Sequence, residues 1–297
     1  MPRSSILWFA CAFIVLNVGV GFAADPPSPE VKNDLVYAKT GGTDLKLDMV
    51  RPAQGDGPFP AIVVIHGGGW RAGSKNGNRP MLVELAKRGY VAISPQYRFC
   101  PKDTFPAQVH DVKAAVRWLR THKDEYKIDG DHIGAVGFSA GGHLSLMLGL
   151  TGPEDGLEGD VPTDAPSSKV QAVVNYFGPT DLGASDIPDV SKPLVKDFIG
   201  GTSTEKADAF AKASPLTHVS KGDAPILTFQ GTRDPLVPFT QAEKLTSAMT
   251  KAGVPGRTEL LLGAGHGWQG ADLDHTMTET YAFFDRYLKP NAKPKAK

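Results

Sequence analysis

The sequence contains very little cysteine and no excess of charge of either sign. Only two of its 297 residues are cysteines, Cys11 and Cys100. Cys11 lies in an N-terminal segment that we expect to be removed, so Cys100 is left alone and the mature chain cannot form an intrachain disulfide. Lys plus Arg and Asp plus Glu both total 32. Nothing in this balance indicates a nucleic acid or an anionic membrane as a stable partner.

Metal-binding patterns and long apolar runs are also scarce. The sequence has neither an H-E-x-x-H motif nor clustered cysteine ligands, so we expect no metal and no cofactor. The one long apolar run, residues 6–20, follows Arg3 and precedes the small residues Gly21 and Ala23. This order is typical of a secretory signal peptide, so residues 1–23 are predicted to be cleaved and the protein exported to the periplasm or the cell exterior. A retained N-terminal anchor is the alternative, although the run is short for a membrane span.

Beyond residue 23, short β-branched runs alternate with longer helical patterns, which is typical of βα units around a mostly parallel sheet. The predicted strands cover residues 36–40, 45–51, 61–65, 91–94, 133–138, 170–176, 226–230 and 259–262. The predicted helices cover residues 81–88, 107–123, 140–150, 240–251 and 276–288. We expect one α/β domain over residues 24–288, with an eight-stranded sheet and helices on both faces. Residues 289–297 are expected to form a basic flexible tail.

Two segments interrupt this alternation, residues 152–169 and residues 180–223. Long insertions in a compact domain are often lids or binding loops. Both follow predicted strands at the edge where open α/β sheets bind ligands. Neither shows the amphipathic apolar face expected for docking on a lipid surface, which argues against a lipase and against membrane association.

A serine lies between glycines at a predicted strand-to-helix turn, in the run G-F-S-A-G at residues 137–141. A serine at such a turn holds a strained backbone, and glycines two residues to either side let the chain pack closely through it. The helix that follows places its N-terminus beside developing negative charge. We therefore predict Ser139 as a catalytic nucleophile.

Three consecutive glycines follow the predicted strand 61–65, in the run H-G-G-G-W at residues 66–70. Their backbone N–H groups are unobstructed by side chains, as an oxyanion hole requires. We predict that the amides of Gly68 and Gly69, joined by that of Ala140, stabilise a tetrahedral oxyanion. His66 is expected to hold the loop rather than to act in catalysis.

A nucleophilic serine needs a base, and the base needs an orienting carboxylate. His266 lies between glycines in a loop after the last predicted strand, where its imidazole has room to reach Ser139, so we predict it as the base. The other histidines lie in helices, in their flanking loops or in an insertion: His110, His122, His132, His143, His218 and His275. Asp234 follows the strand 226–230 and is the predicted acid, with Asp181 after the preceding strand as the alternative.

Together these motifs resemble the hormone-sensitive-lipase-like and bacterial feruloyl-esterase-like (BD-FAE) branch of the α/β-hydrolases, over residues 45–288. The resemblance implies an α/β-hydrolase fold and cofactor-free hydrolysis of carboxylic esters. It further implies short acyl groups as substrates, including acetyl or feruloyl groups on plant polysaccharides. These esterases often carry a cap ahead of the oxyanion loop. Little precedes Leu45 here, so the two insertions are expected to cover the site.

Two tryptophans flank the predicted site, Trp70 beside the oxyanion loop and Trp268 beside the base. Either is suited to pack against an acyl or sugar ring of a substrate, and ordinary packing in the protein is the alternative for both. A small-molecule or polysaccharide ester is therefore the expected partner. The sequence does not indicate an oligomeric state.

Two other functions remain as alternatives. A prolyl-oligopeptidase-type peptidase shares a similar serine turn and acid loop, but this chain has no room for the propeller of such enzymes. A non-catalytic binding module on the same scaffold normally lacks a member of the catalytic triad, and Ser139, Asp234 and His266 are all present.

Overall fold

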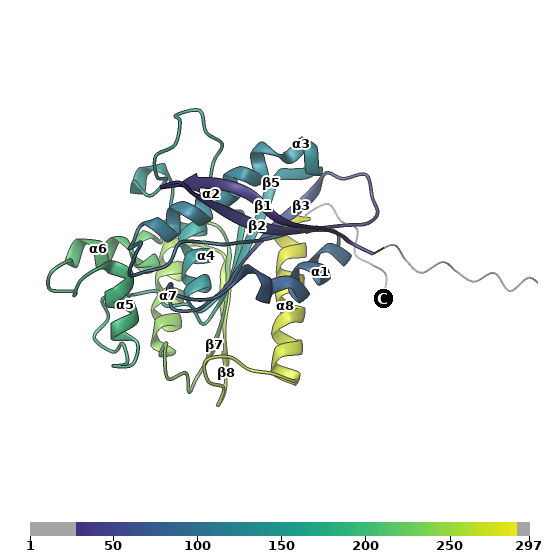
Figure 1. Ribbon diagram of the computed structural model, residues 1–297. Coiled ribbons are helices and arrows are strands. Elements are labelled where there is room, and N and C mark those ends of the chain that lie inside the picture. Colours follow the sequence, from purple (N-terminus) through teal and green to yellow (C-terminus); the bar gives the residue numbers. More distant parts are fainter. Residues whose placement is uncertain (1–27, 290–297) are drawn as a thin grey trace, which may run out of the picture.

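The computed structural model describes residues 28–289, in which eight strands form one twisted sheet (Figure 1). The strand order is β1-β2-β4-β3-β5-β6-β7-β8. β1 and β2 form an antiparallel hairpin and β2 pairs antiparallel with β4, whereas the other pairs are parallel. The strands are β1 (Glu30–Thr40), β2 (Thr43–Arg51), β3 (Phe59–Ile65), β4 (Val91–Pro95), β5 (Ile128–Phe138), β6 (Ala172–Tyr176), β7 (Ile226–Gly231) and β8 (Gly256–Leu261). The predicted mostly parallel eight-stranded sheet is confirmed.

The centre of the sheet is buried on both sides. In β3, Ile62 and Val64 pack into one hydrophobic cluster, while Val63 and Ile65 pack into the other. Successive side chains of a strand point to opposite faces, so a strand that is apolar throughout can fill two cores at once.

Helices cover both faces of the sheet. α1 (Arg79–Lys87) and α8 (Ala271–Leu288) lie on one face, where Leu82 and Phe284 belong to the same cluster as Val64. α2 (Ala107–Thr121), α4 (Ala140–Leu150) and α7 (Thr240–Ala252) lie on the other, and the short α3 (Lys123–Tyr126) follows α2. Over residues 28–289, no helix combines the length and the hydropathy needed to span a bilayer. The predicted signal peptide and all of the predicted tail except Lys289 lie outside the described residues.

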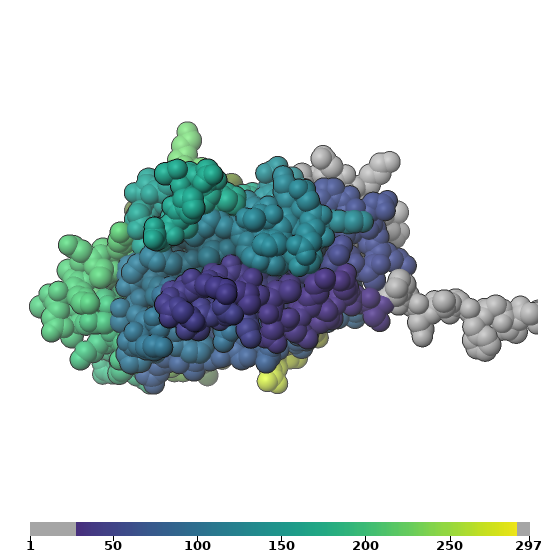
Figure 2. Space-filling view, turned by 45° about the horizontal axis from the view of Figure 1, so that its top comes forward, coloured from purple at the N-terminus to yellow at the C-terminus, as the bar shows by residue number. Residues whose placement is uncertain are grey.

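The insertion at residues 180–223 contains two helices that the sequence pattern does not predict, α5 (Lys192–Ile199) and α6 (Ala207–Lys212), followed by the 3₁₀ helix η3 (Pro215–His218). α5 and α6 form one end of the molecule (Figure 1), and the space-filling view shows the β1–β2 hairpin, in purple, exposed across the front of the domain (Figure 2). The absence of an apolar face for docking on a lipid surface stays a prediction, but α5 does have an apolar face, which buries Val195, Phe198 and Ile199. Two helical turns are too short for the pattern to stand out, and the apolar face is turned toward the protein.

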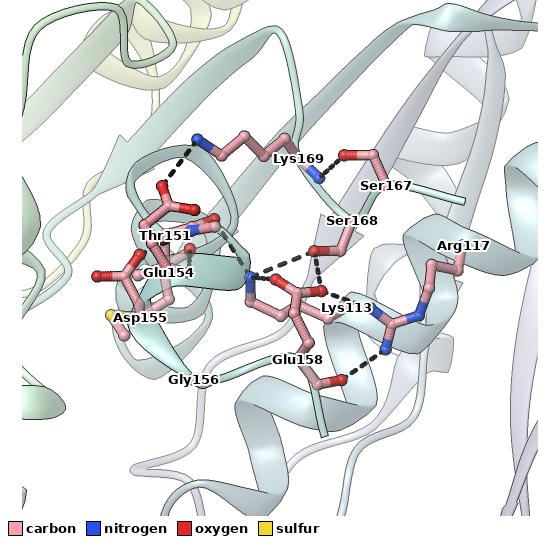
Figure 3. Close-up of polar contacts among 12 residues, drawn as sticks. Lys113, Arg117, Thr151, Glu154, Asp155, Gly156, Glu158, Ser167, Ser168 and Lys169 are labelled. Atoms are coloured by element: carbon pink, nitrogen blue, oxygen red, sulfur yellow. Dashed lines mark hydrogen bonds and ion pairs between the residues drawn. The ribbon is translucent and has the colours of Figure 1, made fainter. Parts of the chain in front are cut away.

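The insertion at residues 152–169 contains only the 3₁₀ helix η2 (Pro153–Asp155) and is tied to α2 by buried charges (Figure 3). Lys113 Nζ donates to Glu158 Oε1 at 2.6 Å and to Ser168 Oγ at 3.2 Å. Arg117 Nη1 donates to the other oxygen of Glu158 at 2.7 Å. Burial lowers the pKa of Lys113. Burial acts to raise the pKa of Glu158, but the hydrogen bonds from Lys113 and Ser168 and the nearby positive charges outweigh it, so the pKa of Glu158 is lowered. This cluster holds the loop where few apolar residues are available to do so.

Candidate active site

Ser139 lies at the turn between β5 and α4, as predicted. Its φ and ψ angles are 54° and −119°, a region that non-glycine residues rarely occupy and that costs about 1–3 kcal/mol. A Cβ atom on Gly137 would collide with the carbonyl of Gly141, and one on Gly141 would collide with the carbonyl of Ile65. Glycine is therefore required at residue 137 for the turn to close and at residue 141 for the turn to pack against β3.

The glycine run after β3 forms a loop directly beside this turn. Gly68 and Gly69 have φ angles of 118° and 59°, and a Cβ on Gly68 would collide with the carbonyl of Ala72. The Gly68 carbonyl accepts the amide of Ala72 at 3.1 Å, which closes the loop. Among the hydrogen bonds within residues 28–289, none uses the amides of Gly68, Gly69 or Ala140. These three N–H groups are available to an oxygen atom in front of Ser139.

His66 supports this loop from behind. Its Nδ1 lies 2.7 Å from the Gly67 carbonyl oxygen, and its ring stacks on Tyr97 with 4.4 Å between centroids. Burial lowers the pKa of His66, which favours the neutral imidazole. The Tyr97 hydroxyl donates to the His66 carbonyl at 3.0 Å.

The structure pairs His266 with Asp234. His266 Nδ1 lies 2.7 Å from Asp234 Oδ2, and the Asp234 side chain has 0% exposure. The other carboxylate oxygen accepts the backbone amides of Leu236 and Val237 at 2.8 and 2.9 Å. Because a carboxylate only accepts, His266 carries a proton on Nδ1, and in the neutral imidazole this leaves Nε2 as an acceptor.

Asp181, the alternative acid, lies elsewhere. Its Oδ2 accepts from Lys244 Nζ at 3.2 Å, and its backbone amide donates to the Gln241 side chain at 2.7 Å. The position after β6 is thus used to anchor the insertion to α7, whereas the position after β7 meets the histidine.

Ser139 and His266 line one cavity of about 470 Å³. Within the described residues, no hydrogen bond joins the two side chains. The distance between a nucleophile and its base is often too long for a hydrogen bond when no substrate is bound. The cavity wall is mostly apolar and combines the glycine loop, the insertion at residues 180–223 and the loop after β7. Its side-chain lining includes Trp70, Phe138, Phe177, Pro179, Leu182, Ile187, Ser191, Leu194, Val195, Leu236, Val237, Pro238 and Gln241. Residues 152–169 contribute nothing to it, so only the second insertion covers the site.

The two tryptophans are placed differently. Trp70 lines the cavity and stacks on Phe198 of α5 with 4.4 Å between ring centroids. Trp268 is absent from the cavity lining, and its Nε1 donates to Thr276 Oγ1 at 2.9 Å. It packs edge-on against Phe177 at 5.2 Å, and Phe177 in turn lies 4.6 Å from the His266 ring. Trp268 therefore lies behind the cavity wall.

Three residues of the site carry no sequence motif. Gln230 at the end of β7 donates to Asp234 Oδ2 at 3.1 Å, and Phe177 backs the imidazole of His266. Leu194 of α5 covers Gly69 so closely that a Cβ there would lie 3.2 Å from it. The sequence gives no motif for these contacts, because an apolar or amide residue at a strand end or in an insertion is common and does not indicate a catalytic neighbour.

With this geometry in view, the similarity to known proteins is informative. The family model BD-FAE matches residues 47–249. The chain belongs to the BD-FAE family. Among relatives of this BD-FAE protein, the probable carboxylic ester hydrolase LipM of Mycobacterium tuberculosis is 33% identical over 70% of this chain and 49% of its own length. The chain spans about half the length of the curated relatives that it matches.

Solved structures resemble this BD-FAE protein over nearly their whole length. A thermophilic esterase from Thermogutta terrifontis, Est2, has 29% identity and a TM-score of 0.73, with 90% of this chain and 96% of that chain covered. A carbohydrate esterase from gut microbiota has 27% identity and a TM-score of 0.75, with 89% and 99% covered. The chain therefore has the α/β-hydrolase fold that its motifs imply. Within the described residues, no group of three or more His, Cys, Asp or Glu side chains is placed to hold a metal ion.

Proposed function

We propose that this chain is an exported serine carboxylic ester hydrolase that acts on short-chain acyl esters. The observation that carries the proposal is the arrangement around one apolar cavity. Ser139 lines this cavity from a strained turn, His266 lines it as well, and Asp234 Oδ2 lies 2.7 Å from Nδ1 of the His266 imidazole. Similarity to an ester hydrolase and to solved esterases supports the same reaction class.

The reaction follows from these placements. His266 Nε2 accepts the proton of Ser139 Oγ as that oxygen attacks the ester carbonyl carbon, and the negative charge develops on the carbonyl oxygen. The amides of Gly68, Gly69 and Ala140 donate to that oxygen. The imidazolium, stabilised by Asp234, gives its proton to the departing alcohol and leaves an acyl-enzyme. Water then attacks the carbonyl carbon of the acyl-enzyme and loses a proton to the same nitrogen. That proton passes to Ser139 Oγ as the bond between Oγ and the acyl carbon breaks, which releases the acid and restores the free serine.

The size and lining of the cavity favour small acyl groups, and the proposed substrates are acetyl or feruloyl esters of polysaccharides. A volume of about 470 Å³ with an apolar wall accommodates an acyl chain but offers few partners to a charged one. A carbohydrate esterase is among the similar structures, and the Thermogutta esterase has been solved with propionate and with butyrate bound. The signal peptide expected at residues 1–23 would bring the enzyme to such substrates outside the cytoplasm.

The test is a substrate series on the purified mature protein. We expect turnover of p-nitrophenyl acetate and butyrate, a fall toward the dodecanoate, and release of acetate from acetylated xylan or of ferulate from methyl ferulate. Ser139→Ala should abolish turnover with the protein still folded. An aminoacyl-proline amide serves as the comparison, since cleavage of that amide without ester turnover would show a peptidase instead. Unchanged ester hydrolysis in Ser139→Ala would show that Ser139 is not the nucleophile.

A further inference from the structure

His143 is a buried histidine with no part in the reaction above, and it joins three elements around the site. It lies one turn after Ser139 on α4 and is fully buried. The Trp70 indole donates from Nε1 to His143 Nδ1 at 3.2 Å. On its other side, His143 Nε2 lies 2.8 Å from the carbonyl oxygen of Ala213, in the insertion after α6. One imidazole thus connects the nucleophile helix, the glycine loop and the insertion.

The two partners leave a single protonation state. An indole N–H only donates, so Nδ1 must be unprotonated, and a carbonyl only accepts, so Nε2 must carry the proton. An imidazolium would set a second donor against the Trp70 N–H. Burial lowers the pKa of His143 to about 4, and His218 in the same insertion adds to this effect when it is charged. His143 is therefore neutral under ordinary conditions.

Trp70 is restrained by three contacts at the end of the glycine loop. Trp70 directly follows Gly69 and has a φ of 57°, so a rotation there would move the Gly69 amide. Its carbonyl accepts the Cys100 amide at 3.0 Å, its ring stacks on Phe198, and its N–H is held by His143. Of these restraints, only the bond to His143 comes from the helix that carries the nucleophile.

We propose that His143 is a positioning residue that holds the oxyanion loop in register with Ser139 through its hydrogen bond to Trp70. The inference rests on the proposed ester hydrolysis and adds a residue outside the triad. Displacing an oxyanion donor affects the transition state more than substrate binding, because the donor meets full negative charge only there. Loss of the bond should lower kcat and leave KM nearly unchanged.

Two amide variants separate the two hydrogen bonds of His143. The amide of asparagine reaches about as far as Nδ1, so His143→Asn can still accept from Trp70 but gives up Ala213. Glutamine reaches about as far as Nε2, so His143→Gln can still donate to Ala213 but gives up Trp70. Thr151→Val is the matched control, because it removes a buried hydrogen bond of the same helix, Thr151 Oγ1 to Met147 O at 2.6 Å, away from the loop.

We expect kcat for p-nitrophenyl acetate to fall about tenfold or more in His143→Gln, with KM within threefold, since complete loss of one oxyanion donor costs about 10²–10³ in kcat. His143→Asn and Thr151→Val should stay within threefold of the unmodified enzyme. Thermal unfolding confirms that each variant is folded at the assay temperature. If His143→Gln does not fold, Trp70→Phe removes the donor of the same bond and should show the same fall in kcat.

The inference is overturned if His143→Gln keeps its kcat, or if His143→Asn falls as far as His143→Gln. Those results leave the proposed function intact, because the unmodified enzyme would still hydrolyse the ester and Ser139→Ala would not. Absence of turnover in the unmodified enzyme would instead remove the proposed function and this inference with it.

Discussion

Replacing Asp234 by asparagine changes one atom of the carboxylate and reverses the hydrogen bonding of His266. Asp234 Oδ1 accepts two backbone amides, and Oδ2 accepts from His266 Nδ1 at 2.7 Å and from Gln230 Nε2 at 3.1 Å. The two amides require an oxygen, so the new NH₂ group takes the place of Oδ2. It then faces the donor of Gln230 and the protonated Nδ1 of His266. The imidazole can accept a hydrogen bond from this NH₂ group only if its proton moves from Nδ1 to Nε2. Nε2 is then protonated and can no longer accept the proton of Ser139.

The expected magnitude follows from this change of tautomer. In a serine protease triad the equivalent substitution lowers kcat about 10⁴-fold with the geometry intact. That factor corresponds to about 5.5 kcal/mol of transition-state stabilisation. The Asp234 side chain is shielded from solvent, at 0% exposure, so water cannot replace the lost acceptor. We expect a fall in kcat of about 10³- to 10⁴-fold, with KM changed much less.

The assay is steady-state hydrolysis of p-nitrophenyl acetate by Asp234→Asn and by Asp181→Asn. Asp181→Asn is the matched control, because its carboxylate follows the neighbouring strand but bonds Lys244 at 3.2 Å. It should retain kcat within about twofold, since a partly exposed ion pair contributes little. A large loss in Asp181→Asn together with a small one in Asp234→Asn would refute the assignment of the acid.

Three further outcomes concern stability. The pKa of His143 is about 4 in the folded chain and 6.5 ordinarily, so the unfolded chain takes up a proton first as the pH falls. The contribution of His143 to the free energy of unfolding should therefore drop by up to about 3 kcal/mol between pH 6.5 and 4, and the loss of stability measured in urea over this range should be smaller in His143→Asn by up to that amount. Lys113→Met leaves Glu158 without its buried ammonium partner and should lower the free energy of unfolding by about 3 kcal/mol, again measured in urea. Gly141→Ala drives a methyl group into the carbonyl of Ile65 and should cost more than the roughly 1–3 kcal/mol of ordinary overpacking, seen as loss of soluble, folded protein.

The regular part of the fold was predictable because its signals are local. An apolar run such as residues 61–65 fills two cores at once, and the two glycines at 41 and 42 turn the chain between antiparallel strands β1 and β2. Element ends were less certain. α8 begins at Ala271, five residues before the predicted start at residue 276, because Asp272 and Asp274 favour a helix N-terminus that no apolar periodicity marks.

The cavity wall was harder to predict, because it depends on contacts between distant residues. α5 spans eight residues, so its apolar positions fill only about two turns and are not distinguishable from a loop by pattern alone. Yet Leu194 and Val195 from this helix face the same cavity as Ser139. Trp268 shows the converse, since its position beside the base suggested substrate contact while its ring packs behind Phe177.

The choice between Asp181 and Asp234 shows why the acid was left open at the level of sequence. Both follow the end of a parallel strand, so both reach the same edge of the sheet, and only the path of each loop separates them. After β7, the amides of Leu236 and Val237 turn back onto the carboxylate of Asp234 and fix it toward His266. After β6, Gln241 binds the Asp181 backbone and draws that loop to α7. Because the same loop leads into α5, anchoring Asp181 also places the cavity wall. Substitutions in the segment that leads from Asp181 to α5 should therefore alter the range of acyl groups that the enzyme accepts and leave the reaction at Ser139 unchanged.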